Sequence, residues 1–192
     1  MEDNHFVIDI ETCPISTTGY MVLSEEEKLK LINPIDSKVI ALGIRHNNED
    51  IIFIGDDEKR LLENFWNKWR AIKETNPVTK IIGFNLIDFD LSFLTTRSLI
   101  NNVQICPFVL KHIVDLRDKI SAYRNGKTKG KLKDFAPFMG LTVKEIDGSN
   151  IADLWMEKKY DIIKDYLIND LKITEELYKR TKETNIIYIE RW

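Results

Sequence analysis

Two carboxylates lie two residues apart near the start of the chain, at the end of an apolar run. The stretch from Phe6 to Thr12 is rich in apolar and β-branched residues and predicts a buried strand, on which Asp9 and Glu11 point to the same face. Such acids repel each other unless a cation lies between them, and Mg²⁺ prefers carboxylate oxygens, water and phosphate as ligands. The pair therefore indicates a divalent metal site, and a strand that merely ends in solvent is the alternative.

A third acid, Asp170, falls on the apolar face of a long helix that the sequence predicts over residues 159–180. A carboxylate that faces a packed sheet is unfavourable unless it is protonated, paired with a cation or bound to metal. Tyr166 precedes it by four residues, so the phenol and the carboxylate share that face. The alternative is a core tyrosine beside an ordinary salt-bridging acid. Glu175 is assigned to the opposite, polar face of the helix.

A fourth acid follows a predicted short strand at about residues 78–83. Of the two aspartates there, Asp88 suits the N-cap of the next helix, because an acid at a helix start accepts backbone N–H groups and complements the helix dipole. Asp90 is then expected in the first turn, facing back toward the strand ends. A further Asp-x-Glu sequence, from Asp56 to Glu58, opens another helix with Asp56 as the expected cap. Capping and the helix dipole explain its three acids, so no chemistry is assigned to it.

The elements that must position these residues alternate between strand and helix patterns. Residues 12–36 form an insertion-like stretch, with a short helix predicted from Ser24 onward. No repeat or linker divides the chain, so a single α/β domain of residues 1–192 is predicted. The other expected elements are a hairpin of strands 39–44 and 51–54, a helix from Asp56 to Asn76, a strand near 112–116, and helices around 131–139, 149–157 and 159–180.

Composition limits the classes of partner. Lys and Arg number 28 against 31 Asp and Glu, a net charge of −3 that gives no overall basic signature for nucleic-acid binding. No apolar run reaches the roughly 18 residues of a membrane span, and the two distant cysteines lack zinc spacing, so a soluble, cytoplasmic protein without a membrane partner is expected. A basic stretch is equally consistent with phosphate contacts and with a solvated turn; its candidate cations are Arg124, Lys127, Lys129 and Lys131.

Taken together, the three acidic stretches resemble the motifs of a known family. The sequence is similar to the DEDDy group of 3′–5′ exonucleases in the DnaQ-like, ribonuclease H-like superfamily, and most similar to the proofreading exonuclease domain of family B DNA polymerases. The resemblance covers about residues 5–180. The variant motif with histidine in place of tyrosine is excluded, because no histidine is followed five residues later by aspartate. The matching residues are Asp9, Glu11 and Thr12, then Asn85, Phe89 and Asp90, then Tyr166 and Asp170.

The resemblance implies a ribonuclease H-like fold, with a five-stranded mixed sheet flanked by helices. It implies that Asp9, Glu11, Asp90 and Asp170 hold two Mg²⁺ or Mn²⁺ ions for phosphodiester hydrolysis. Tyr166 is then expected to orient the attacking water, since a phenol with a pKa of about 10 is a poor base. By the same resemblance, the residues expected to contact the 3′-terminal nucleotides are Thr12, Asn85 and Phe89.

The expected function is a metal-dependent 3′–5′ exonuclease acting on DNA, preferably single-stranded. We expect it to stand alone, because 192 residues leave no room for a polymerase domain. Two alternatives remain open: a 3′–5′ exoribonuclease or oligoribonuclease, and a non-catalytic nucleic-acid binding module on the same fold. The presence of all four acids and the tyrosine argues against the second alternative.

Overall fold

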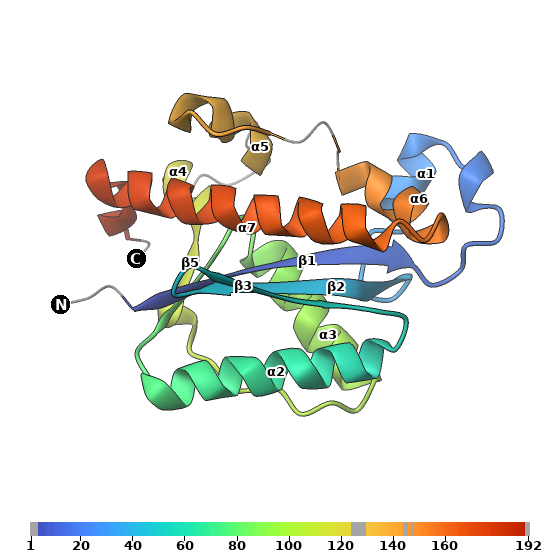
Figure 1. Cartoon of the computed structure of the whole chain (residues 1–192), viewed down its shortest axis with the longest axis horizontal. Coiled ribbons are helices and arrows are strands. Elements are labelled where there is room, and N and C mark those ends of the chain that lie inside the picture. Colours follow the sequence, from blue (N-terminus) through green and yellow to red (C-terminus); the bar gives the residue numbers. More distant parts are fainter. Residues whose placement is uncertain (1–3, 124–129, 144–145, 147, 191–192) are drawn as a thin grey trace.

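The strands form one mixed sheet at the centre of the molecule. The computed structural model describes residues 4–123, 130–143, 146 and 148–190. Within them the sheet has five strands in the order β3-β2-β1-β4-β5 (Figure 1). The sheet pairs β1 antiparallel with β2 and parallel with β4, so the predicted five-stranded mixed sheet is confirmed. The strands are β1 (His5–Pro14), β2 (Ser37–His46), β3 (Glu49–Ile54), β4 (Lys80–Gly83) and β5 (Ile113–Asp115).

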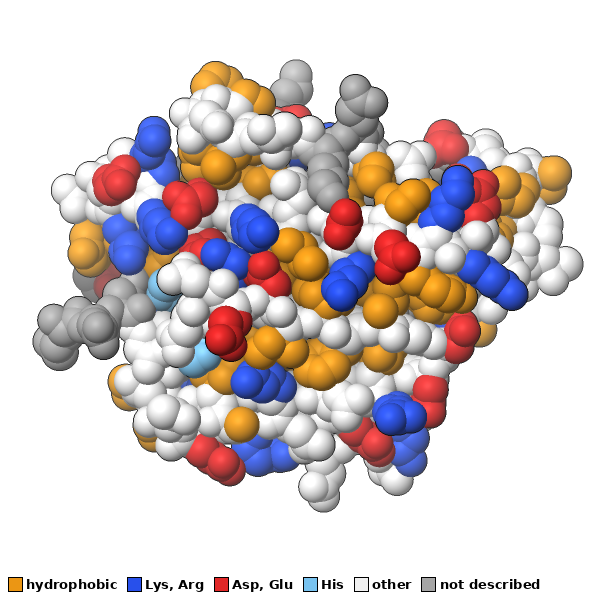
Figure 2. All heavy atoms as spheres, viewed as in Figure 1, with side chains coloured by type: hydrophobic (Ala, Val, Ile, Leu, Met, Phe, Trp, Pro, Cys, Tyr) orange, Lys and Arg blue, Asp and Glu red, His pale blue; other side chains and the backbone are white. Residues whose placement is uncertain are grey.

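Helices cover both faces of this sheet. The helices α2 (Glu58–Thr75) and α3 (Ser92–Ile100) lie on one face, and α7 (Tyr160–Glu183) lies across the other (Figure 1). The outer side of α7 carries charged side chains of both signs (Figure 2), as its amphipathic sequence predicts. No helix in the described residues has the length and apolar composition needed to cross a membrane.

The core follows from the alternation of side chains along β1. Phe6, Ile8 and Ile10 are buried with the tryptophans of α2, whereas Val7 is buried with residues of α7 such as Leu171. The even-numbered side chains of this strand therefore build the core under α2. The odd-numbered ones, Asp9 and Glu11 among them, are directed to the α7 face.

The long helix comes close to the sheet at a glycine. A Cβ atom on Gly43 of β2 would lie 2.7 Å from Leu171 Cδ1 and 3.1 Å from Leu167 Cγ. These distances are shorter than ordinary van der Waals contact, so only glycine lets α7 pack at this depth. This close approach sets the distance between α7 and the neighbouring strand β1.

The predicted hairpin is confirmed, with a turn of two asparagines. Asn47 and Asn48 connect β2 to β3 with φ angles of 51° and 64°. Asparagine tolerates this left-handed conformation better than most residues, which suits a two-residue hairpin turn.

The shorter elements differ in detail from the prediction. The region around 131–139 divides into α5 (Leu132–Phe135) and a 3₁₀ turn at Pro137. The region around 149–157 divides into a 3₁₀ turn and α6 (Ile151–Met156). The helix predicted after Ser24 is present, and Ser24 and Glu27 form a capping box. The remaining helices are α1 (Glu25–Lys30), α4 (Leu116–Ile120), α5 (Leu132–Phe135) and α6 (Ile151–Met156). Single turns are at Tyr20–Val22, Ile87–Leu91, Leu110–His112, Ala136–Met139, Gly148–Asn150 and Ile186–Tyr188.

The acids at the start of α2 do not act as predicted. Asp57, not Asp56, caps the helix by accepting a hydrogen bond from the backbone N–H of Arg60. Glu58 is buried and receives two hydrogen bonds from the guanidinium of Arg97, at 2.9 and 2.6 Å. The prediction that capping and the helix dipole explain all three acids was therefore wrong for Glu58, which belongs to a buried ion pair.

Glu175 was also placed wrongly by the helical pattern. It is buried rather than exposed, and its carboxylate accepts a hydrogen bond from Arg45 of β2. Arg45 also donates to Asp50 of β3 at 2.7 Å. The helical periodicity of α7 places Glu175 on the polar face. The arginine that neutralises its charge lies on β2, so the sequence of α7 alone does not indicate that Glu175 is buried.

Candidate active site

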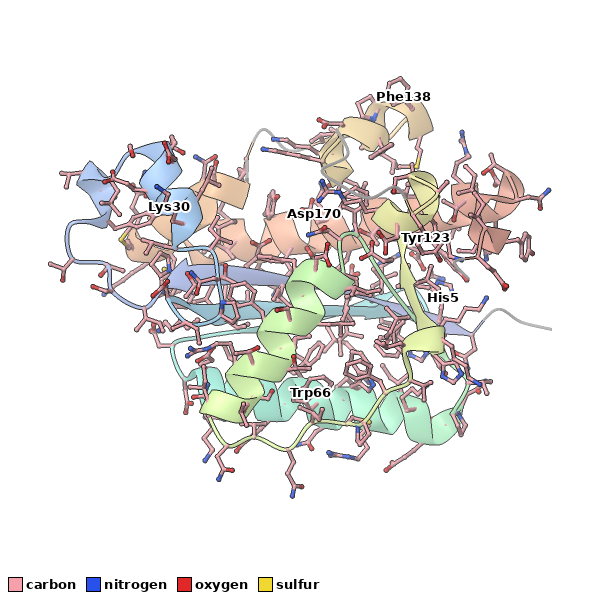
Figure 3. The ribbon with its side chains drawn as sticks, turned by 180° about the vertical axis from the view of Figure 1, so that it is seen from behind. His5, Lys30, Trp66, Tyr123, Phe138 and Asp170 are labelled. Carbon is pink, nitrogen blue, oxygen red and sulfur yellow. The ribbon has the colours of Figure 1, made fainter. Side chains whose placement is uncertain are left out.

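Three of the predicted acids come together between β1 and α7. One carboxylate oxygen from each of Asp9, Glu11 and Asp170 lies within 4.8 Å of the other two. The first two come from successive odd positions of β1, and Figure 3 shows Asp170 on the side of α7 that faces the sheet. Oxygen atoms grouped in this way form a donor set suited to a hard divalent cation.

The fourth acid, Asp90, lies next to this group but is not part of it. Asp90 is 2% exposed and belongs to the π-helical turn Ile87–Leu91 that precedes α3. Asp90 lies close enough to Asp9 for its negative charge to raise the pKa of the Asp9 carboxyl. Asp90 Oδ1 is buried and has no hydrogen-bond partner among the described residues.

The electrostatics of the site favour a bound cation. Burial raises the pKa of Asp9 well above its usual value, and the nearby charges of Asp90, Glu11 and Asp170 raise it further. Burial and the same negative neighbours, Asp170 and Asp90, raise the pKa of Glu11. The pKa of Asp90 is also raised, chiefly by burial. The group repels itself when ionised, and one oxygen has no partner, so the residues present fit a divalent metal ion.

Tyr166 lies beside the acids, one helical turn before Asp170. Burial raises the pKa of its phenol, as do the charges of Asp170, Glu11 and Asp9 and a hydrogen bond between the phenol and Asp170. The hydroxyl therefore stays protonated at neutral pH and can act as a hydrogen-bond donor.

Asp115, at the end of β5, holds the turn that carries Asp90. Its carboxylate accepts hydrogen bonds from the backbone N–H groups of Asn85 at 3.0 Å and Ile87 at 2.9 Å. The prediction that Asp88 caps this helix was wrong. Asp88 is exposed, and the N-cap position of the turn receives no side-chain hydrogen bond. The sequence leaves two interpretations of Asp115 open, a residue that supports the site or a mere strand end, and the partners that decide between them lie about thirty residues earlier in the chain.

The three predicted nucleotide contacts are not equivalent in the structure. Thr12 and Phe89 line a cavity of about 290 Å³ that also exposes Asp9, Glu11 and Asp170. Asn85 does not line this cavity. It adopts a φ of 60°, and its side-chain oxygen accepts a hydrogen bond from Arg117 at 2.9 Å. Of the four candidate cations, Lys131 is exposed just before α5, and Arg124, Lys127 and Lys129 lie outside the described residues.

This sheet order, with helices on both faces and acids converging beside the central strand, defines a ribonuclease H-like protein. The chain belongs to the RNase_H superfamily, whose family model matches residues 32–182. The matched region includes Asp90, Tyr166 and Asp170. Membership indicates nuclease-type chemistry on a nucleic acid, and the family predicted from the three motifs is confirmed at this level.

Two known proteins are similar over most of the chain. An uncharacterized protein of Methanocaldococcus jannaschii is 37% identical over 167 residues, which cover 81% of this chain and 92% of that protein. The family B DNA polymerase of the hyperthermophilic archaeon Pyrobaculum calidifontis matches 97% of this chain with a TM-score of 0.71 and 16% identity. The chain spans 25% of the length of that polymerase. The likeness to the polymerase is a likeness of fold.

Proposed function

We propose that this protein is a metal-dependent 3′–5′ exonuclease that removes nucleotides from the 3′ end of DNA, preferably single-stranded. The observation that carries the proposal is the convergence of Asp9, Glu11 and Asp170 within 4.8 Å, with the buried, unpartnered oxygen of Asp90 next to them. We also propose that residues 1–192 act as one exonuclease domain. Superfamily membership supports the reaction class, and the resemblance to the DEDDy group of exonucleases supports the direction of digestion.

In this proposal the four acids hold two Mg²⁺ or Mn²⁺ ions. Ions bound by Asp9, Glu11, Asp90 and Asp170 supply a more acidic attacking water and neutralise charge on the leaving 3′ oxygen. The protein fixes the positions of the ligands, because Asp9 and Glu11 share one strand face and Asp115 holds the turn that carries Asp90.

Tyr166 positions the attacking water by hydrogen bonding. Its raised pKa keeps the proton on the phenol, so it is a donor and not a base. Thr12 and Phe89 contact the nucleotide at the scissile phosphate, since both line the cavity that exposes the acids. Asn85 contributes indirectly, by fixing the chain that leads to Asp90.

The test is digestion of 5′-labelled single-stranded DNA and RNA of one sequence, with Mg²⁺, Mn²⁺ or EDTA. We expect a metal-dependent ladder that shortens from the 3′ end of DNA, and a loss of at least about 100-fold in rate for Asp9→Ala. Asp56→Ala is the matched control, because Asp56 begins the second Asp-x-Glu sequence but is exposed and does not line the cavity that the acids line.

The outcomes separate the alternatives. Faster digestion of the RNA strand than of the DNA strand would show that RNA, and not DNA, is the preferred substrate. Binding of either strand without cleavage under any metal would reject the exonuclease and leave a non-catalytic binding module.

A further inference from the structure

One edge of the sheet is left open. Within the described residues, β3 is paired with β2 on one side and with no strand on the other. Proteins usually protect such an edge with a proline, a lysine or a bulge, because its unpaired backbone groups attract other strands. The six residues of β3 include no proline, lysine or arginine, and their register with β2 is regular. The edge therefore lacks the usual features that prevent pairing with another chain.

The backbone groups of β3 that face outward follow from one hydrogen bond. The N–H of Gly55 donates to the carbonyl of Ile40 at 3.2 Å, and these two residues are the next opposite pair after the end of the β2–β3 register. Because hydrogen-bonded pairs alternate along an antiparallel ladder, every second residue of β3 turns its N–H and C=O away from β2. None of the other backbone hydrogen bonds between described residues uses these groups. The outward-facing residues are Asp50, Ile52 and Ile54.

The side chains along this edge are apolar on both faces of the sheet. Four of them are only partly buried, two against the core on the α7 face and two against the core on the α2 face. Apolar side chains reach the surface between these two helices in Figure 2. Partly exposed β-branched and aromatic residues stabilise a sheet when a neighbouring strand covers them. The four residues are Ile52 and Ile54 on the α7 face, and Ile51 and Phe53 on the α2 face.

We propose that two copies of this protein pair through β3, antiparallel about a two-fold axis at Ile52, and so form a dimer with one continuous sheet. Ile52 then lies opposite Ile52 of the second copy, and Asp50 lies opposite Ile54. This pairing uses the N–H and C=O groups of all three outward-facing residues, so the strand is complementary to itself. No described residue of β3 lines the cavity that exposes the acids, and each copy keeps its own site.

The helices leave room for this pairing. Gly43, which is opposite Ile52, lies directly under Leu171 and Leu167, so α7 crosses the sheet over β2. In the dimer the two β2 strands are three strand spacings apart, which is roughly 14 Å. Packed helices need only about 8–10 Å between their axes. The two copies of α7 therefore fit side by side on one face of the continuous sheet.

The charges beside this edge are also complementary. Asp50 is paired with Arg45 at 2.7 Å and with Lys172 at 3.8 Å, so it does not repel another strand as an isolated charge would. Lys164 is exposed and precedes Lys172 by about two helical turns, roughly 12 Å along α7. Ile54 packs with this earlier part of α7. Since Ile54 faces Asp50 of the second copy, each Lys164 lies near a carboxylate of the other chain and attracts it.

Sedimentation equilibrium of the wild-type chain tests the association. We expect a species of twice the monomer mass, in exchange with monomer. Lys164→Glu should raise the Kd of the dimer by about 5-fold or more, because two attractive contacts become repulsive. Lys111→Glu is the matched control and should leave the Kd unchanged. It makes the same change of charge at an exposed residue just before β5, at the other edge of the sheet.

Cysteine cross-linking tests the register of the pairing. Opposite residues of a hydrogen-bonded antiparallel pair have Cα atoms about 5.5 Å apart, a distance that a disulfide can span. Oxidised Ile52→Cys should therefore run as a covalent dimer on a non-reducing gel. Ile51→Cys is the control and should remain monomeric on that gel, because residue 51 points to the other face and does not lie opposite its own copy. Cys13 and Cys106 are buried, so the wild type should not cross-link.

Three results would overturn the proposed dimer. The first is a wild type that stays monomeric at every concentration at which it is soluble. The second is a dimer that Lys164→Glu does not weaken, or that the two cysteine variants cross-link equally, since either result would place the contact elsewhere on the surface. The third is an assembly larger than a dimer, because a two-fold contact through one edge closes on itself.

Discussion

Asp9 lies among three other carboxylates whose charges all raise its pKa. A buried acid whose pKa is higher in the folded than in the unfolded chain destabilises the fold when it is ionised at neutral pH. The residue that we propose as a metal ligand is therefore unfavourable for stability in metal-free protein. A neutral side chain of the same shape removes that repulsion.

We accordingly predict that Asp9→Asn raises the Tm of the protein in EDTA by a few degrees, at about 2–4 °C per kcal/mol for a chain of this size. The same variant should lose the rise in Tm that Mg²⁺ or Mn²⁺ gives the wild type. Differential scanning calorimetry with and without metal measures both effects. Asp56→Asn serves as control and should change neither. A lower Tm for Asp9→Asn in EDTA would contradict the repulsion described for the site.

The positions of these acids could be predicted because local geometry determines them. Asp9 and Glu11 share a face through the two-residue period of a strand, and Tyr166 and Asp170 through the four-residue spacing of a helix. The structure brings all four to one site. Tyr20 and Lys28 also line the cavity and could not be found in this way, because only the tertiary fold brings the stretch between β1 and β2 to the acids.

At the scale of elements, the turn before α3 depends on an acid from a different strand. Asp115 of β5 accepts the backbone N–H groups of Asn85 and Ile87, whereas Asp88 within the turn is exposed. Sequence reasoning chose Asp88 because it stands near the helix start. The choice was wrong because the acid that accepts these N–H groups lies on β5, and the sequence around the turn does not indicate a partner so far along the chain.

We predict that Asp115→Ala destabilises the protein by about 1–3 kcal/mol, because the partly buried N–H groups of Asn85, Ile87 and Arg117 lose their acceptor. The displaced turn should move Asp90 and lower kcat by about 10- to 100-fold, as small shifts in catalytic geometry do. Asp88→Ala should leave the free energy of unfolding within about 0.5 kcal/mol of wild type and kcat unchanged. Urea unfolding and exonuclease kinetics on both variants provide the comparison. Equal effects of the two substitutions would show that the turn does not depend on β5.

At the scale of the whole molecule, a buried ion pair joins three elements behind the site. Glu58 of α2 accepts hydrogen bonds from Arg97 of α3 and from the backbone N–H of Val39 in β2. Arg97 also donates a hydrogen bond to the carbonyl of Pro34, in the stretch that connects α1 to β2. The sequence assigned Glu58 to the helix start because its partner lies 39 residues further along the chain.

We predict that Glu58→Ala lowers the free energy of unfolding by about 3–5 kcal/mol, since it leaves Arg97 buried without its partner. Asp57→Ala should lower it by only about 1 kcal/mol, the usual cost of losing an N-cap. Urea unfolding of both variants compares two neighbouring acids whose roles the sequence did not distinguish. The double variant Glu58→Ala, Arg97→Met should recover part of the loss, and a double variant no more stable than Glu58→Ala would count against the buried pair.

The two ends of the described chain lie at one end of the long axis of the molecule, and α1 lies at the other (Figure 1). His5 and Lys30 mark these opposite ends in Figure 3. An affinity tag or a surface linker attached at either end of the chain thus holds the protein with α1, and the cavity that α1 helps to line, turned toward the bulk solution. The proposed digestion of a strand should therefore proceed as freely on protein immobilised on a sensor chip or a bead as in solution, which opens it to single-molecule measurement.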